Sequence, residues 1–93
     1  MVEEPISICE AILKRHGATE IYVFGSHAKG SATSESDLDL AVNGLDEGEY
    51  FHILGELMSA VHGAVDLVLL DDGSPFAEHL RVKIERGWLQ RVA

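Results

Sequence analysis

The sequence predicts an α/β or α+β domain in which helices flank one central β-sheet. Segments with helical spacing of apolar residues alternate along the chain with short runs rich in β-branched and aromatic residues. No repeat, low-complexity tract or linker interrupts this alternation. A length of 93 residues suits one domain, spanning 1–93. Alternation of this kind favours packing of the helices on a single sheet.

The first two elements are a helix near 4–16 and a strand over 21–24. Apolar residues recur at helical spacing in the first segment: Ile8, Cys9, Ile12 and Leu13. Gly17 is a natural end for that helix because glycine readily adopts the conformation that follows a helix C-terminus. The sequence Ile-Tyr-Val-Phe that follows is typical of a strand.

A turn and loop over 25–36, with room for a short helix beginning at Ser26, lead to the middle of the chain. Over 37–42, Leu38, Leu40 and Val42 alternate with Asp37, Asp39 and Ala41, which predicts a strand with one polar face. Apolar residues at helical spacing then predict a long helix near 47–62: Tyr50, Leu54, Leu57, Met58 and Val61.

The last third of the chain repeats the strand-then-helix order. The apolar run 65–70 predicts a third strand, and 71–75 has the composition of a turn. A helix near 76–86 places Phe76, Leu80 and Ile84 on one face and ends at Gly87. Residues 88–92 are expected to add a short terminal strand.

Composition and charge exclude several classes of protein. The chain has 46% hydrophobic and 25% charged residues, as an ordinary globular domain has. A net charge of −9 argues against a protein that grips nucleic acid directly by its phosphates, although a nucleotide bound through metal ions remains compatible. One cysteine excludes an intrachain disulfide, and the longest apolar run is too short to cross a membrane. We therefore expect a cytoplasmic protein without a signal peptide.

The segment after the first strand carries the clearest chemical signal. Gly25 and Ser26 follow the strand directly and can offer backbone N–H groups and a hydroxyl to an anion. Asp37 and Asp39 point to the same face of the next strand because side chains alternate with a period of two. Carboxylates so placed can hold a hard cation such as Mg²⁺. The pattern therefore favours chemistry on a nucleoside triphosphate.

A third carboxylate, Asp66, interrupts the apolar strand 65–70, where a charge is costly unless it is solvated, paired or bound to metal. If the second and third strands are neighbours, Asp37, Asp39 and Asp66 converge and could bind two ions for an in-line phosphoryl displacement. An isolated Asp-x-Asp is common on exposed strands and turns. The ordered combination of strand, Gly-Ser, ten residues, Asp-x-Asp and a later strand Asp is much rarer by chance.

This combination resembles the signature of the minimal nucleotidyltransferase (MNT) domain of the DNA polymerase β superfamily. The matching residues are Gly25, Ser26, Ala28, Gly30, Ser36, Asp37, Asp39 and Leu40. The resemblance extends over nearly the whole chain, because 65–68 suits the strand that carries the third carboxylate. It implies the nucleotidyltransferase fold, a small mixed central sheet flanked by helices.

The resemblance also implies a role for each site residue. Gly25 and Ser26 would hold the β and γ phosphates of the nucleotide. The catalytic and metal-binding set would be Asp37, Asp39 and Asp66, with two Mg²⁺ ions and ATP as the substrate. Asp66 would also orient or deprotonate an acceptor hydroxyl that attacks the α-phosphate. Many members have arginines in the loop where this chain has His27, Lys29 and Thr33, and Lys29 is the candidate that retains a phosphate contact.

The acceptor is a separate question because the chain shows no second domain to bind one. Stand-alone MNT domains are typically encoded beside an all-helical HEPN protein, and as antitoxins they transfer AMP from ATP to a tyrosine of that ribonuclease toxin. The resemblance therefore implies a HEPN-type toxin as the partner. Two alternatives stay open: a binding module that neutralises its partner by masking it, and a homodimer that modifies a small molecule.

Overall fold

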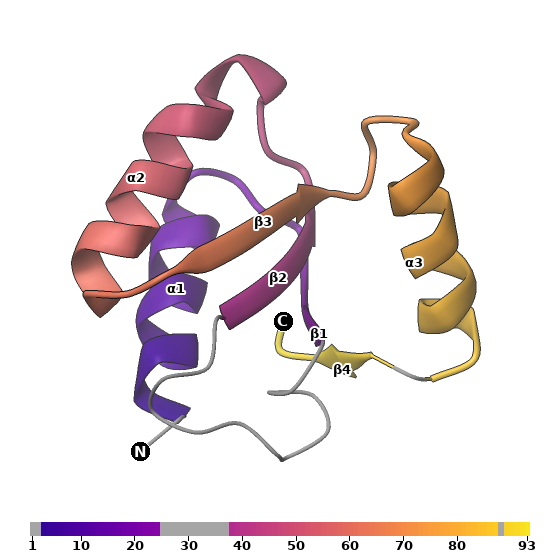
Figure 1. The fold of residues 1–93 in the computed structure, drawn as a ribbon, viewed down its shortest axis with the longest axis horizontal. Coiled ribbons are helices and arrows are strands. Elements are labelled where there is room, and N and C mark those ends of the chain that lie inside the picture. The colour runs from indigo at the N-terminus through magenta and orange to yellow at the C-terminus, as the bar shows by residue number, and fades with distance from the viewer. Residues whose placement is uncertain (1–2, 25–37, 88) are drawn as a thin grey trace.

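The computed structural model describes residues 3–24, 38–87 and 89–93 (Figure 1). The elements follow in the order α1 (Glu3–Arg15), β1 (Glu20–Phe24), β2 (Leu38–Asn43), the 3₁₀ turn η1 (Glu47–Glu49), α2 (Tyr50–Val61), β3 (Val65–Leu69), α3 (Pro75–Glu85) and β4 (Gln90–Arg91). Each helix and strand predicted for the described residues is present, and their ends differ from the predicted ones by a few residues. The α+β class is confirmed.

The strands form one mixed sheet in the order β3-β2-β1-β4. The pairs β1–β2 and β1–β4 are antiparallel, and β2–β3 is parallel. A parallel pair needs a crossover between the two strands, and α2 supplies it. The second and third strands of the sequence are therefore neighbours, which was the condition for their carboxylates to meet.

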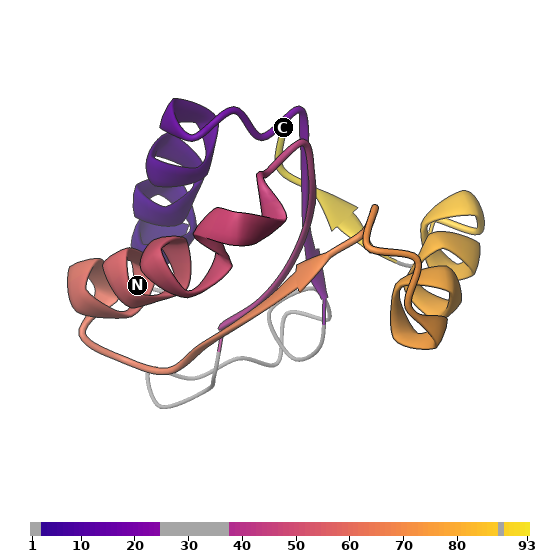
Figure 2. The same cartoon turned by 90° about the horizontal axis from the view of Figure 1, so that it is seen from above.

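Helices α1 and α2 cover one face of the sheet, whereas α3 lies on the other (Figure 2). The side of α1 and α2 holds the larger core, to which β2 contributes Leu38, Leu40 and Val42. Cys9 and Leu13 of α1 and Leu57 of α2 are completely buried in this core. The alternation of β2 therefore points its apolar residues toward the two-helix layer, as its sequence pattern predicted.

The opposite face of the sheet is less polar than the sequence indicated. Ala41 is completely buried there, in a small cluster with Tyr22, Leu70 and Leu80 of α3. The sequence analysis grouped Ala41 with Asp37 and Asp39 on the polar face of β2, and α3 packs over the part of that face that holds Ala41. Asp39 stays on this face at the first half of the strand.

Two helices present apolar side chains to solvent that the sequence pattern placed on their inner faces. Phe76 on α3 is 50% exposed, whereas Ala77 and Leu80 are buried. On α2, Met58 is 41% exposed and Ile53 occupies the core. The spacing rule defines a stripe around the helix, but the packing of the helix selects which edge of that stripe is covered.

Candidate functional site

Asp39 and Asp66 lie side by side on the parallel strands β2 and β3. They are Cα partners in the register of the pair, flanked by the partners Leu38–Val65 and Leu40–Leu67. Register partners on adjacent strands project to the same face of a sheet. Because Leu38, Leu40 and Leu67 belong to the core beneath α1 and α2, the two carboxylates project to the face on which α3 lies.

The exposure of its side chain explains why the carboxylate of Asp66 is tolerated within the apolar strand β3. Val65 and Leu67 are buried, whereas Asp66 between them is exposed. Asp39 is partly buried. The strand therefore inserts its apolar residues into the core and leaves Asp66 in water, so the desolvation cost that the sequence suggested is avoided.

The charge of Asp66 also acts on a neighbouring group. Burial raises the pKa of Tyr50, and the negative charges of Asp66 and Asp72 raise it further. The Tyr50 hydroxyl donates a hydrogen bond to the backbone carbonyl of Leu67, 2.6 Å away.

The carboxylates of Asp39 and Asp66 point to one face of the sheet and create a local negative potential there. Such a potential attracts cations.

The other predicted site residues fall outside the described part of the chain: Gly25, Ser26, Lys29 and Asp37. The structure therefore brings together two of the three predicted catalytic carboxylates, Asp39 and Asp66. Among residues 3–24, 38–87 and 89–93, no group of three or more His, Cys, Asp and Glu side chains is placed to hold a metal ion.

The residues that are described fit Mg²⁺ by the chemistry of their donors. Mg²⁺ takes oxygen ligands, typically one or two carboxylates together with water and substrate phosphates. Asp39 and Asp66 supply two such carboxylates on one face, and the exposure of Asp66 leaves room for water or phosphate to complete the coordination. Asp37 as a further ligand remains a prediction from the sequence.

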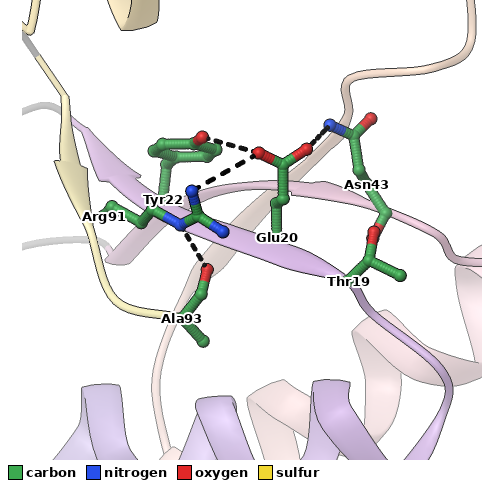
Figure 3. Close-up of polar contacts among 6 residues, drawn as sticks. All are labelled: Thr19, Glu20, Tyr22, Asn43, Arg91 and Ala93. Atoms are coloured by element: carbon green, nitrogen blue, oxygen red, sulfur yellow. Dashed lines mark hydrogen bonds and ion pairs between the residues drawn. The ribbon is translucent and has the colours of Figure 1, made fainter.

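The opposite end of the same face carries a carboxylate with a different role (Figure 3). Glu20 of β1 accepts hydrogen bonds from the Tyr22 hydroxyl and the Asn43 amide, both at 2.9 Å, and pairs with Arg91 at 3.8 Å. The hydrogen bonds from Tyr22 and Asn43 hold the pKa of Glu20 below its ordinary value. Glu20 therefore connects β1 with β2 and β4 through its side-chain contacts. The candidate catalytic carboxylates Asp39 and Asp66 lie at the other end of this face.

One aromatic residue beside the site was missed by the sequence analysis. Phe76 makes an edge-to-face ring contact with Phe24, the residue whose Cα partner is Asp39. The sequence analysis placed Phe76 only on the apolar face of α3, with Leu80 and Ile84. No sequence signal distinguishes it from Leu80, because both occupy the same helical stripe.

Comparison with known protein families decides the identity of this fold. The family model for polymerase β nucleotidyltransferases matches residues 8–85, which includes both β2 and β3 with their carboxylates. The chain belongs to the polymerase β nucleotidyltransferase family.

Solved structures with this nucleotidyltransferase fold agree with that assignment. A minimal nucleotidyltransferase is 31% identical, with 98% of this chain and 93% of that chain covered and a TM-score of 0.69. A chain of a mutant MntA–HpeT toxin–antitoxin complex is 26% identical, with coverage of 95% and 71% and a TM-score of 0.72. A chain from the complex of a tri-AMPylated Shewanella oneidensis HEPN toxin with its MNT antitoxin is 20% identical and shares the fold, with coverage of 94% and 93% and a TM-score of 0.62.

Two further findings concern sequence relatives of this nucleotidyltransferase domain and the length of its helices. A search of curated protein sequences found no significant match. None of the helices in the described part of the chain combines the length and the apolar character needed to cross a membrane.

Proposed function

We propose that this domain transfers AMP from ATP to a hydroxyl group of a HEPN-type toxin and thereby acts as its antitoxin. The observation that carries the proposal is the register pairing of Asp39 with Asp66 in a chain of the nucleotidyltransferase family. A nucleotidyltransferase needs carboxylates that converge on one point of the sheet, and these two do so from adjacent strands.

Each residue of the site has a part in the proposed mechanism. Asp39 and Asp66 would hold Mg²⁺ together with Asp37, while Gly25, Ser26 and Lys29 would contact the phosphates of ATP. Bound Mg²⁺ neutralises negative charge on the phosphate oxygens and on the departing pyrophosphate. Asp66, whose side chain is exposed on β3, would accept the hydrogen bond of an acceptor hydroxyl that approaches from solution.

The transfer itself is a displacement at phosphorus. The acceptor oxygen forms a bond to the α-phosphorus, and the bond from that phosphorus to the bridging oxygen of the β-phosphate breaks. Pyrophosphate leaves with the bonding electron pair, and the hydroxyl proton passes to Asp66 or to water. Positioning of the acceptor in line with the leaving group supplies much of the rate gain.

A protein acceptor is supported by the relatives and by the charge of the chain. Two of the three similar structures described above are toxin–antitoxin complexes, and in one of them the HEPN toxin is AMPylated. A net charge of −9 suits association with a basic partner, such as a protein that binds RNA. We therefore favour transfer to a protein over transfer to a small molecule.

A transfer assay tests the proposal. The domain is incubated with Mg²⁺, α-labelled ATP and the HEPN-type protein encoded nearby, beside a double variant Asp39→Asn/Asp66→Asn. Label on the partner with the wild-type domain but not with the double variant is the expected result. A stable complex that inhibits the partner without label would indicate masking, and label on a small acceptor alone would indicate the third function; either result would overturn transfer to the toxin.

A further inference from the structure

An aromatic pair stands beside the acidic pair on the same face of the sheet. The rings of Phe24 and Phe76 have centroids 6.3 Å apart and an angle of 63° between their planes. Phe24 is partly buried at the end of β1, whereas Phe76, in the first turn of α3, is 50% exposed. The pair therefore presents the ring of Phe76 to solvent and supports it from below with Phe24.

The sheet register fixes the position of this pair relative to the carboxylates. Phe24 is the Cα partner of Asp39, and Asp39 is the Cα partner of Asp66. The three side chains therefore form one row across β1, β2 and β3 on a common face. Cβ atoms of such cross-strand partners are about 4.5–5.5 Å apart. Phe76 continues this row from the helix that lies on the same face.

The start of α3 is built to hold Phe76 in place. Ser74 caps the helix, its hydroxyl accepting a hydrogen bond from the backbone N–H of Ala77 at 3.1 Å. The backbone N–H of Ser74 in turn donates to Asp72 at 2.8 Å. Pro75 restricts the backbone immediately before Phe76. The cap and Pro75 therefore fix where α3 begins, and with it the backbone position of Phe76.

A second exposed phenylalanine shows that exposure alone carries no such argument. Phe51 is 83% exposed, but it lies on α2, which covers the other face of the sheet. Phe76 differs because it adjoins the row that contains both candidate metal ligands. A nucleotide whose phosphates are held at Asp39 and Asp66 carries its base one ribose away from them, and Phe24, the cross-strand partner of Asp39, is the next side chain along the row.

We infer that Phe76, supported by Phe24, is a stacking platform for the base of the bound nucleotide. The inference rests on the proposed function and extends it from the phosphates to the base. Aromatic side chains stack on the face of any base, so a base with a larger ring system makes a larger stacking contact with Phe76. The predicted ligand class is therefore a purine nucleotide, held at one end through its phosphates and at the other by stacking.

The test compares the binding of Mg²⁺-ATP with that of Mg²⁺-tripolyphosphate, which has the phosphates but no base. Calorimetric titrations are made with the wild-type chain, Phe76→Ala, Phe76→Trp and the control Phe51→Ala. Phe76→Ala is expected to weaken ATP binding about tenfold and to leave tripolyphosphate binding unchanged. Phe76→Trp is expected to retain ATP affinity, and Phe51→Ala to match the wild type. Thermal unfolding of each variant verifies that the fold is kept.

Several outcomes would overturn the platform. ATP affinity unchanged in Phe76→Ala would do so while leaving the proposed function standing. An equal loss for ATP and tripolyphosphate would mean that Phe76 supports the phosphate site. A wild type that binds neither ligand would overturn the proposed function together with the platform.

Discussion

Gly44 lies directly against the backbone of Gly17. A Cβ atom on Gly44 would be 2.8 Å from the carbonyl oxygen of Gly17 and 3.0 Å from the backbone nitrogen of Thr19. Gly44 also has a φ of +98°, which side chains rarely permit. The contact joins the end of β2 to the turn between α1 and β1, where the Thr19 N–H donates to the Asn43 carbonyl at 2.8 Å.

Gly44→Ala is expected to destabilise the domain by at least about 2 kcal/mol, because the new methyl group meets backbone atoms that cannot move independently and the backbone conformation is strained. Urea denaturation monitored by circular dichroism measures the effect. A midpoint equal to that of the wild type would show that this close approach does not constrain the fold.

Gly55→Ala provides the matched control, since the same substitution there meets open space. Nothing lies within 4 Å of a Cβ built on Gly55, which is in the middle of α2. Alanine favours the helix over glycine by about 1 kcal/mol. The midpoint of denaturation should therefore rise for Gly55→Ala and fall for Gly44→Ala.

The Cys9 thiol is expected to be unreactive in the native protein. Burial raises the pKa of Cys9 from 9.0 to about 11, so the thiol is protonated at pH 8 and shielded from reagents. Ellman's reagent should label it at pH 8 only after denaturant is added. Rapid stoichiometric labelling without denaturant would contradict the buried position.

The raised pKa of Cys9 also determines how the free energy of unfolding changes with pH in alkaline solution. Below pH 9 the thiol is neutral in both the folded and unfolded states and contributes no pH dependence. Between pH 9 and about 11 the unfolded chain loses the proton and the native state keeps it, so stability falls as the pH rises. Cys9→Ala should lack this component of the alkaline decline.

Glu20 gives the opposite pH dependence. Hydrogen bonds from Tyr22 and Asn43 hold its pKa below the ordinary 4.5, so its contribution is present above that value and is lost as the pH falls through the lowered pKa. The group is partly exposed, and the effect should be below about 1 kcal/mol. The difference in unfolding free energy between wild type and Glu20→Gln should shrink from pH 6 to pH 3. A difference independent of pH would contradict the account.

Local patterns in the sequence predicted the elements because each element repeats its apolar residues at its own period. Leu38, Leu40 and Val42 fixed the inward face of β2, and those residues are buried as expected. The covering of the other face could not be predicted in this way. Ala41 is compatible with either environment, and only the placement of α3 over it determines that it is buried. The exposure of Phe76 depends on the same placement.

The candidate site was predictable in part because a charge within an apolar run is conspicuous. Asp66 stood out for that reason, and its convergence with Asp39 followed once β2 and β3 were shown to pair. The periodicity of apolar residues within a strand does not indicate which strands are neighbours in the sheet. The pairing of β2 with β3 could therefore be inferred only from the structure or from the family resemblance. The phosphate-binding roles of Gly25, Ser26 and Lys29, and the metal-binding role of Asp37, stay predictions.

The measurement that tests the central claim most directly is Mg²⁺-dependent binding of ATP by wild type, Asp39→Asn, Asp66→Asn and the control Asp71→Asn. Asp71 is an exposed aspartate outside the row of Asp39 and Asp66, and the Gly44 backbone N–H donates a long hydrogen bond of 3.5 Å to its carboxylate. Both site variants are expected to keep the fold but to lose at least about tenfold in affinity, whereas Asp71→Asn should bind as the wild type does. Undiminished Mg²⁺-dependent affinity in both site variants would contradict the assignment of Asp39 and Asp66 as the metal-binding pair.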